Sequence, residues 1–364
     1  MENYLYEVIT DKALDIKAQS LRVVFHILSF FYCALVRLQD FVYKKKILRP
    51  AHLEVKVISV GNITWGGTGK TSLVSILAKF LSGKGKRIAI LSRGYKRVQS
   101  TEYREQKTRE EYQLMGDEAC LLKEKFPEIP VLVGRDRVEN AIKAVKDFQA
   151  EVVLLDDGFQ HRRIKRDLDI VSIDCLNPFG NGYCIPRGIL REPKSSLERA
   201  DLVVLTNAEF NKEEAKELEF DIRDINSKAP IVYASYRALC VRDFPSGQVI
   251  IPSHMVGKPV CLFAGIGNFE SFRNTFVSSI GGNVKLEFNF PDHYQYQKQD
   301  LLEIQDACIK QGVNLIITTE KDLVRLKQFI DNSLLVKIAV LEVELEILKN
   351  KDKFFERVEN VCLG

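Results

Sequence analysis

Residues 55–81 read VKVISVGNITWGGTGKTSLVSILAKFL, and this stretch decides the fold. Its first six residues are largely apolar and β-branched, which predicts a strand over 55–60. From residue 71 to 81 apolar side chains recur at helical spacing, which predicts a helix. The segment between them holds four glycines, followed by a lysine and a threonine. Because glycines let backbone N–H groups crowd around phosphate oxygens at a helix N-terminus, the stretch predicts a phosphate-binding loop.

Within this loop, Lys70 is expected to contact the β- and γ-phosphates of ATP, and the Thr71 hydroxyl is expected to bind Mg²⁺. The strict P-loop pattern has glycine at its first position, whereas this chain has threonine at position 64. The alternative, a glycine-rich turn with an incidental lysine, is disfavoured by the strand and the helix on either side. The expected nucleotide-binding residues are Thr64, Trp65, Gly66, Gly67, Thr68, Gly69, Lys70 and Thr71.

A second apolar run, 152–155, ends in the two acids Asp156 and Asp157. A strand of this kind places carboxylates at its carboxyl edge beside the P-loop, where they hold Mg²⁺ directly or through water. Acids at strand ends are common by chance, but the position after a P-loop strengthens this interpretation. We therefore expect Asp156 and Asp157 to form a metal site together with Thr71.

Strand-like and helix-like segments alternate along most of the chain. This alternation favours a P-loop NTPase-type α/β fold, in which a doubly wound parallel sheet carries helices on both faces. A charged, helix-prone stretch near 207–230 separates this block from a second alternating block. We predict three parts: an N-terminal amphipathic helical segment over 1–50, a nucleotide-binding core domain over 51–225 and a smaller C-terminal α/β domain over 226–364.

The composition is that of an ordinary globular protein, with 46% hydrophobic and 28% charged residues. A net charge of +4 fits an anionic ligand or a membrane surface and does not require nucleic acid. We expect neither nucleic-acid binding nor an obligate protein partner. The eight cysteines form no CxxC pair and show no zinc-ligand spacing, which indicates reduced thiols in a cytosolic compartment. The acidic and polar N-terminus predicts no cleavable signal peptide.

The N-terminal segment 21–36, LRVVFHILSFFYCALV, is unusually apolar and is followed by the basic run Lys44–Lys46. Its sixteen residues include Arg22 and His26, and they fall short of the ~20 apolar residues that a membrane-spanning helix needs. One interpretation is an interfacial helix that dips its apolar face into the bilayer while the lysines meet anionic headgroups. The other is a helix packed on the protein core, and the segment by itself does not decide between them.

Two absences indicate which kind of P-loop protein this is. Guanine-specific switches carry Asn-Lys-x-Asp after a late strand, whereas here the strand candidate at 202–205 is followed by TNAE. Partition-type ATPases carry a signature lysine just before the paired glycines, where this chain has Trp65. Both absences favour a small-molecule kinase over a nucleotide-driven switch or a partition-type ATPase.

Residues 59–71, SVGNITWGGTGKT, closely resemble the P-loop of the tetraacyldisaccharide 4'-kinase (lipid A 4'-kinase) family. That family also has threonine at the first loop position. Further matches run from about 55 to 326 with family-like spacing, and the string DDGFQHR is the most distinctive of them. They are SRGY at 92–95, GDE at 116–118, LDDGFQHR at 155–162, Pro186 with LREP at 190–193, AGIGN at 264–268, FPDH at 290–293 and TTEKD at 318–322.

The resemblance implies transfer of the ATP γ-phosphate to the 4'-hydroxyl of a tetraacyldisaccharide 1-phosphate, which forms lipid IVA in lipid A biosynthesis. By family analogy, Asp117 is the base for the attacking hydroxyl, and His293 from the second domain pairs with it. A dyad split between two domains would assemble only on closure, which would limit wasteful ATP hydrolysis. The residues alone favour a helix N-cap for Asp117, and a lone loop histidine such as His293 is usually solvated.

Three further side chains are candidates for the same site. Arg93 and Arg191 are expected to contact a nucleotide or substrate phosphate, because a guanidinium fork matches phosphate geometry. The alternative for each arginine is a surface ion pair. Glu118 is expected to position Asp117 or to contribute to the metal site. Family members often have a second histidine after the first, whereas this chain has Tyr294.

A tetraacylated substrate also bears on the N-terminal segment. Such a lipid resides in the bilayer, so the resemblance favours the membrane interpretation of residues 21–36. We expect a peripheral enzyme at the cytoplasmic face of the bacterial inner membrane, where ATP and anionic headgroups are both present. A P-loop kinase acting on a soluble sugar or nucleoside is the remaining alternative, and it would not require an apolar N-terminal helix.

Overall fold

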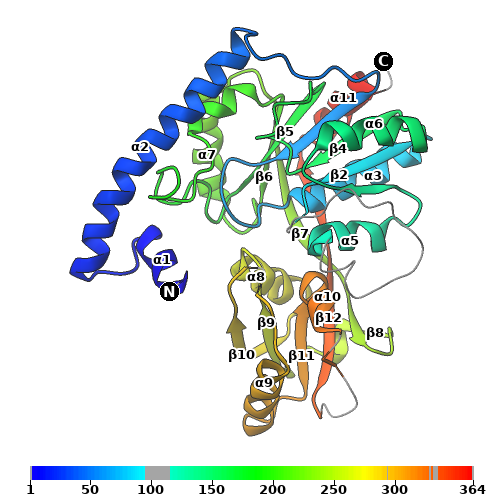
Figure 1. The fold of residues 1–364 in the computed structure, drawn as a ribbon. Helices are drawn as coiled ribbons and strands as arrows, with labels where there is room; N and C mark the ends of the chain where they lie inside the picture. Colours follow the sequence, from blue (N-terminus) through cyan, green and yellow to red (C-terminus); the bar gives the residue numbers. More distant parts are fainter. Residues whose placement is uncertain (1, 95–114, 293, 328, 331–334, 363–364) are drawn as a thin grey trace. The chain divides into compact units, whose positions relative to one another are not determined.

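The computed structural model describes residues 2–94, 115–292, 294–327, 329–330 and 335–362 (Figure 1). The chain forms two compact units, and neither is continuous in sequence. The P-loop unit comprises Met1–Arg93, Asp136–Ala234 and Ile347–Gly364. The second unit comprises Gly94–Arg135 and Ser235–Glu346.

These units differ from the predicted division near residue 225, because contacts distant in sequence regroup two helices. Helix α11 (Lys351–Cys362) returns to the P-loop unit, where Glu359 pairs with Lys84 at 2.8 Å. The rings of Phe80 and Phe355 also stack there at 4.4 Å. Helix α5 (Asp117–Lys125) instead belongs to the second unit, because its acids pair with bases of α10 (Glu320–Leu326).

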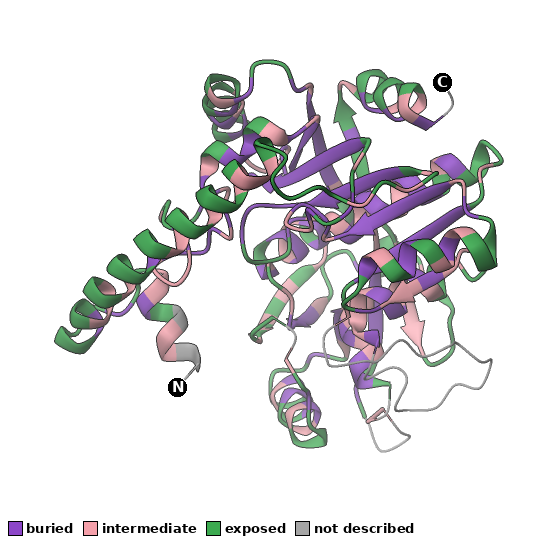
Figure 2. Cartoon of the chain, turned by 45° about the horizontal axis from the view of Figure 1, so that its top comes forward, coloured by how far each residue is buried: buried purple, intermediate pink, exposed green. Residues whose placement is uncertain are grey.

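The sheet of the P-loop unit is parallel, in the order β7-β6-β5-β1-β4-β2. Its inner strands are buried except at Lys56, the first residue of β1, as expected for a parallel sheet covered on both faces. Figure 2 shows these strands almost entirely in the buried colour. The strands are β1 (Lys56–Gly61), β2 (Ile88–Ser92), β4 (Val152–Asp156), β5 (Leu168–Asp174), β6 (Leu202–Thr206) and the first part of β7 (Ile231–Phe244).

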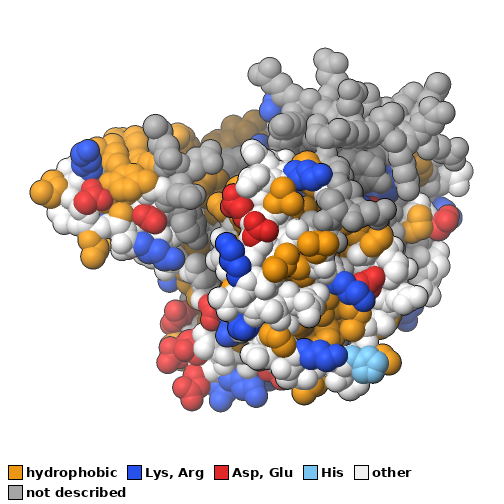
Figure 3. All heavy atoms as spheres, turned by 90° about the horizontal axis from the view of Figure 1, so that it is seen from below, with side chains coloured by type: hydrophobic (Ala, Val, Ile, Leu, Met, Phe, Trp, Pro, Cys, Tyr) orange, Lys and Arg blue, Asp and Glu red, His pale blue; other side chains and the backbone are white. Residues whose placement is uncertain are grey.

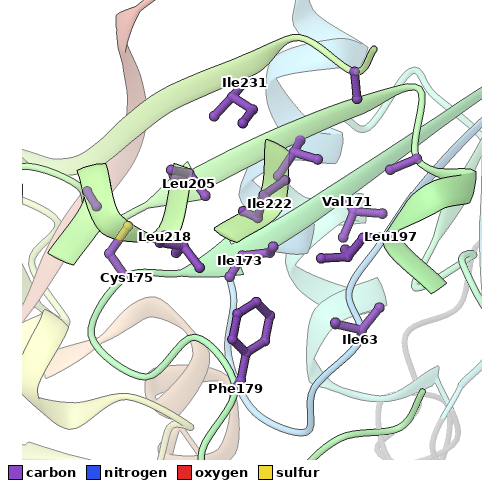
Figure 4. Packing of buried hydrophobic residues seen from close by; sticks show 14 of the residues in the cluster. Ile63, Val171, Ile173, Cys175, Phe179, Leu197, Leu205, Leu218, Ile222 and Ile231 are labelled. Atoms are coloured by element: carbon purple, nitrogen blue, oxygen red, sulfur yellow. The ribbon is translucent and has the colours of Figure 1, made fainter. Parts of the chain in front are cut away.

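Helices α3 (Lys70–Gly83), α6 (Arg137–Phe148) and α7 (Lys212–Ile225) belong to the same unit. Figure 4 shows how α7 is packed: Leu218 and Ile222 lie against Leu205 of the neighbouring strand. Full burial of one such side chain stabilises the fold by about 1.5–3 kcal/mol. The predicted P-loop α/β architecture is confirmed, and β1, the loop and α3 occur where the sequence predicts them.

The N-terminus forms α1 (Glu2–Ile9) and the long helix α2 (Ile16–Lys44). Helix α2 has 29 residues and begins at Asp15, whose side chain accepts from the backbone N–H of Ala18 at 2.9 Å. By length and composition it is long and apolar enough to cross a membrane, so the expectation that it is too short is wrong. The helix extends beyond the apolar segment 21–36 at both ends, and its last turns add the apolar residues Leu38, Phe41 and Val42.

One side of α2 packs on the P-loop unit while the other is exposed. Ser29 Oγ donates to the carbonyl of Cys184 and Tyr32 OH donates to the carbonyl of Arg191, both at 2.8 Å. In Figure 2 most of α2 is green, and in Figure 3 hydrophobic side chains gather where α1 and the first turns of α2 reach to the left. The packed side agrees with the interpretation of a helix packed on the core, and the membrane interpretation of the exposed side stays a prediction. Besides Ile16, the large exposed apolar residues of α2 are Val23, Val24, Ile27, Leu28, Phe30, Phe31, Leu35, Leu38 and Phe41.

The second unit is also built on parallel strands, in the order β10-β9-β11-β12. Two apolar clusters lie in it, one around Phe272 and Phe276 of α8 and one around Leu301 and Ile304 of α9. Strands β7 and β12 each continue from one unit into the other. The remaining elements are β3 (Val131–Val133), β8 (Val249–Ile250), β9 (Pro259–Ala264), α8 (Phe269–Ile280), β10 (Asn283–Asn289), α9 (Lys298–Lys310), β11 (Leu315–Thr319) and β12 (Lys337–Lys349).

Candidate active site

The loop between β1 and α3 has the backbone of a phosphate cradle. Gly66 and Gly69 have φ angles of 114° and 85°, a region that favours glycine. Gly69 is the N-cap of α3, and no side chain caps the helix. The first N–H groups of α3 are therefore directed toward a ligand, and the helix dipole adds partial positive charge there.

Buried polar side chains hold the loop in place. Asn62 Nδ2 donates to Thr68 Oγ1 at 3.0 Å, and the Thr68 carbonyl accepts from Ser172 Oγ and, at 3.3 Å, from Thr206 Oγ1. Ser172 and Thr206 belong to β5 and β6, so two strands of the sheet hold the loop in place. A cradle held in this way pays little ordering cost when phosphates bind.

The backbone pairing at Thr64 explains why the loop can have threonine where the strict P-loop pattern has glycine. Thr64 is 3% exposed and forms an antiparallel bridge with Leu190, while Trp65 N–H donates to the carbonyl of Ile189 at 2.7 Å. This extended pairing suits the β-branched side chain of threonine. The Trp65 side chain itself is 66% exposed.

Lys70, Asp157 and Arg191 form a charge cluster beside the loop. Arg191 NH1 lies 2.7 Å from Asp157 Oδ1, and Lys70 Nζ lies 3.8 Å from the same oxygen. Burial tends to raise the pKa of Asp157, but the charges of Lys70 and Arg191 lower it to about 2. Asp157 is therefore an anion at any physiological pH. Arg191 also donates to Asn62 Oδ1 at 3.2 Å, so the structure brings this predicted phosphate contact into the site.

The predicted metal ligands of the P-loop unit fit Mg²⁺. Val60 of β1 pairs with Asp156 of β4, so the carboxyl ends of these strands are neighbours. Asp156 is 1% exposed, and Thr71 lies in the first turn of α3. One hydroxyl and two carboxylates are hard oxygen donors, and Mg²⁺ is typically held by one or two carboxylates together with nucleotide phosphates. The donor set is therefore suited to an ion shared with ATP.

A buried arginine that the sequence did not single out supports these acids. Arg137 begins α6 and is 3% exposed. Its NH2 donates to the carbonyl of Asp156 at 2.7 Å and its NH1 to the carbonyl of Asp157 at 2.9 Å. Burial lowers the pKa of Arg137 while the two aspartates oppose this. The signal for this residue is weak, since only the N-cap Asp136 before it marks the helix start.

The distinctive string at 156–162 mainly braces the site. A side chain at Gly61 would collide with Phe159, whose Cβ would lie 2.5 Å from it, so glycine permits this contact. Gln160 Nε2 donates to the carbonyl of Asn62 at 2.8 Å. Arg162 pairs with Glu192 at 3.3 Å and with Asp40 of α2. Residues near the loop are thereby tied to α2.

Arg93 follows β2 and is exposed at the carboxyl edge of the sheet. Its positive charge contributes to the lowered pKa of Arg137, which indicates that the two guanidinium groups are near each other. Arg93 is thus at the edge of the acid cluster, and its phosphate contact stays a prediction.

Asp117 and Glu118 lie in the second unit, at the start of α5. Asp117 Oδ2 is 2.9 Å from Arg325 Nε, and Glu118 Oε1 is 2.6 Å from Lys321 Nζ. The N-cap of α5 is Gly116, with a φ of 82°, so Asp117 is the first helical residue and not the cap. The prediction placed Asp117 in the nucleotide domain and its partner in the other domain, whereas these pairs group α5 with α10 in the second unit, which comprises Gly94–Arg135 and Ser235–Glu346.

His293 lies outside the described residues, so its pairing with Asp117 stays a prediction. The metal role of Glu118 also stays a prediction. The neighbouring Tyr294 donates through its hydroxyl to Asp300 Oδ1 at 3.2 Å.

The family model described as Tetraacyldisaccharide-1-P 4'-kinase matches residues 21–363. The chain belongs to this family. Curated tetraacyldisaccharide 4'-kinases support the assignment. The protein from Halothermothrix orenii is 33% identical over 366 residues, covering 95% of both chains. The protein from Syntrophus aciditrophicus is 34% identical and covers 90% of both.

A solved structure of a family member gives the same result in three dimensions. LpxK from Aquifex aeolicus, solved in complex with ATP, aligns with a TM-score of 0.70 and 29% identity. The alignment covers 94% of this chain and 99% of that one. The resemblance stated from the motifs is thereby confirmed. This tetraacyldisaccharide 4'-kinase family member is an ATP-dependent kinase, which sets aside the switch and partition-type ATPase alternatives.

Proposed function

We propose that this chain transfers the γ-phosphate of ATP to the 4'-hydroxyl of a tetraacyldisaccharide 1-phosphate, giving lipid IVA. The observation that carries the proposal is the cluster of Lys70, Asp157 and Arg191 at the uncapped start of α3. Phosphoryl transfer depends mainly on positioning and on neutralising phosphate charge, and this cluster supplies both.

ATP binds with its phosphates against the backbone N–H groups of residues 66–71. Lys70, which lies 3.8 Å from Asp157, exchanges that neighbour for the β- and γ-phosphates. Asp157 then retains Arg191, whose guanidinium stays at the edge of the cradle to meet a phosphate. Thr71, Asp156 and Asp157 would hold Mg²⁺, which supplies charge neutralisation on the phosphates when it is bound.

The attacking hydroxyl needs a base, and we assign this role to Asp117. Its carboxylate stands at the first turn of α5, where acidic side chains interact favourably with the helix dipole. His293 is its proposed partner, and Glu118 its proposed neighbour toward the metal.

The exposed face of α2 supports a lipid substrate and a peripheral position on the cytoplasmic face of the inner membrane. A row of large apolar side chains faces outward, and basic residues follow at Lys44–Lys46. A cavity of about 540 Å³ lies between α2 and residues 182–194. Its wall includes Leu190 and Pro193, on either side of Arg191, so a lipid held at α2 would lie close to the P-loop.

The test is transfer of ³²P from γ-labelled ATP into a chloroform-soluble product with the full chain in detergent–lipid micelles. Lys70→Ala is expected to lower transfer by at least about 100-fold, because it removes phosphate charge neutralisation. Lys79→Ala, an exposed lysine on the same helix, is the matched control and should retain activity. Release of inorganic phosphate without labelled lipid would contradict the proposed function.

A further inference from the structure

The contact between Asp117 and Arg325 joins two motifs that are far apart in the sequence. Arg325 lies in the last turn of α10, a helix that begins within the TTEKD string, and its side chain is 6% exposed. Its Nε lies 2.9 Å from Asp117 Oδ2. Both residues belong to the second unit.

Arg325 is itself held by the backbone of two other segments. Its NH1 donates to the carbonyl of Gly265 at 3.1 Å and to the carbonyl of Tyr294 at 3.2 Å. Gly265 belongs to the AGIGN string, and Tyr294 directly follows His293 in the chain. One guanidinium therefore ties α5 to the segment that carries the proposed partner of the base.

A fully buried acid fixes the other side of the guanidinium. Asp322 Oδ1 lies 3.4 Å from Arg325 NH1 and accepts from the backbone N–H of Gly265 at 3.0 Å and from Tyr296 OH at 2.9 Å. Asp322 Oδ2 accepts from Thr319 Oγ1 at 2.6 Å. Asp322 is 0% exposed, and its carboxylate balances the charge of Arg325. Because Asp322 is also held by its other partners, the side chain of Arg325 has little rotational freedom.

Fold stability alone does not explain the two ion pairs between α5 and α10. A buried ion pair is weak evidence for stability, because the cost of desolvating two charges offsets their attraction. Two acids and two bases meet here in parallel, Asp117 with Arg325 and Glu118 with Lys321. Both acids stand in the first turn of one short helix, so the pairs set the direction of that turn.

We propose that Arg325 is a positioning residue, which holds the Asp117 carboxylate and the segment at Tyr294 in one arrangement so that the base meets the substrate hydroxyl. This inference rests on the proposed function, since it assigns Arg325 a role in the same transfer. Arg325 acts on the reaction only through Asp117. A lysine would keep the charge but not the fork that reaches a carboxylate and two carbonyls at once.

The test is a double-mutant cycle with Arg325→Met, Arg325→Lys and Asp117→Ala in the full chain, using ³²P transfer to lipid. Arg325→Met is expected to lower kcat about 10- to 100-fold, because small misplacements of reacting groups are costly, while the KM for ATP changes less than about twofold. Arg325→Lys should recover part of the loss. Arg273→Met is the matched control, since Arg273 pairs with Glu287 at 2.7 Å on the exposed surface of the same unit.

The double variant decides between positioning and general stability. Asp117→Ala combined with Arg325→Met should be no slower than Asp117→Ala alone, within about threefold, because residues that act through one another are non-additive. Independent, multiplying losses would overturn the inference, as would full activity of Arg325→Met. Wild-type chain that transfers no phosphate to lipid would instead overturn the proposed function, and the inference with it. Thermal unfolding of every variant identifies any loss that comes from misfolding.

Discussion

Arg191 NH1 lies 2.7 Å from Asp157 Oδ1, and Lys70 Nζ lies 3.8 Å from that same oxygen. One carboxylate therefore holds both the P-loop lysine and an arginine from a distant loop. Asp157 has a φ of 52°, the left-handed region, so the turn after β4 aims its side chain away from the strand. This relationship connects the P-loop, the strand of acids and the segment that packs on α2.

Arg191→Met tests the role of that arginine in phosphate contact. We expect the variant to lose at least about tenfold in kcat/KM for phosphoryl transfer, because it removes a bidentate, charged partner for phosphate. Arg191→Lys should keep part of the activity. The measurement is steady-state transfer to lipid in micelles, with Arg223→Met as control, since Arg223 pairs with Glu219 on the exposed side of α7. Equal activity of both variants would remove Arg191 from the site.

His161 gives a prediction for acid stability. Burial, followed by the charges of Arg137 and other arginines, lowers its pKa to about 4 from an ordinary 6.5. The folded state thus binds a proton less readily than the unfolded state, so stability is fully present above pH 6.5 and falls as pH drops toward 4. The free energy of unfolding should decline more steeply over this range for wild type than for His161→Gln. Urea unfolding at a series of pH values measures both, and parallel curves would show that His161 is solvated.

The packing of α2 predicts a specific thiol cross-link. Cys33 Sγ of α2 and Cys184 Sγ lie 2.6 Å apart, with Cys33 the donor. Burial raises the pKa of Cys184, so oxidation should be slow at neutral pH and faster in mild alkali. Diamide treatment followed by peptide mapping should identify a Cys33–Cys184 disulfide that is absent in Cys33→Ser. Separate alkylation of both thiols after diamide treatment would show that α2 does not pack on this segment in solution.

The outer face of α2 predicts membrane binding that depends on apolar contact. Leu35 and Phe31 are 65% and 60% exposed, so a charge at either position should not disturb the fold. We expect Phe31→Glu with Leu35→Glu to reduce sedimentation with phosphatidylglycerol vesicles at least about tenfold, because buried apolar area drives interfacial binding. Gln39→Glu, an exposed polar position on the same helix, is the charge control. Unchanged sedimentation of the double variant would contradict the membrane interpretation.

The sequence predicted the parts of this site that depend on neighbours in the chain. The P-loop, Lys70 and Thr71 follow from a strand, a run of glycines and a helix, and Asp156 follows from a strand that ends in acid. Each of these is a local pattern with a direct physical meaning. The family motifs extended this to Arg191, which the structure brings against Asp157.

Other features depend on contacts between residues far apart in the sequence, and no local pattern reports them. Arg325 lies far along the chain from Asp117, yet their contact decides which unit α5 joins. Arg137, the first residue of α6, supports Asp156 and Asp157 because its guanidinium donates to their backbone carbonyls at the end of β4. Helix α2 extends beyond the apolar segment 21–36, and its C-terminal turns pair through Asp40 with Arg162 and Arg199 and through Lys44 with Glu198. These three partners lie more than 100 residues away along the chain, so the segment itself does not reveal them.

The proposed transfer adds phosphate to the 4'-hydroxyl of the lipid disaccharide, and the position of the new phosphate in the product distinguishes this reaction from any other. The product of the full chain with ATP, Mg²⁺ and a tetraacyldisaccharide 1-phosphate would be examined by two-dimensional ¹H–³¹P NMR. We expect a new phosphate monoester whose phosphorus correlates with the proton on C4', beside the unchanged 1-phosphate signal. A correlation to any other sugar proton, or a diphosphate at position 1, would contradict it.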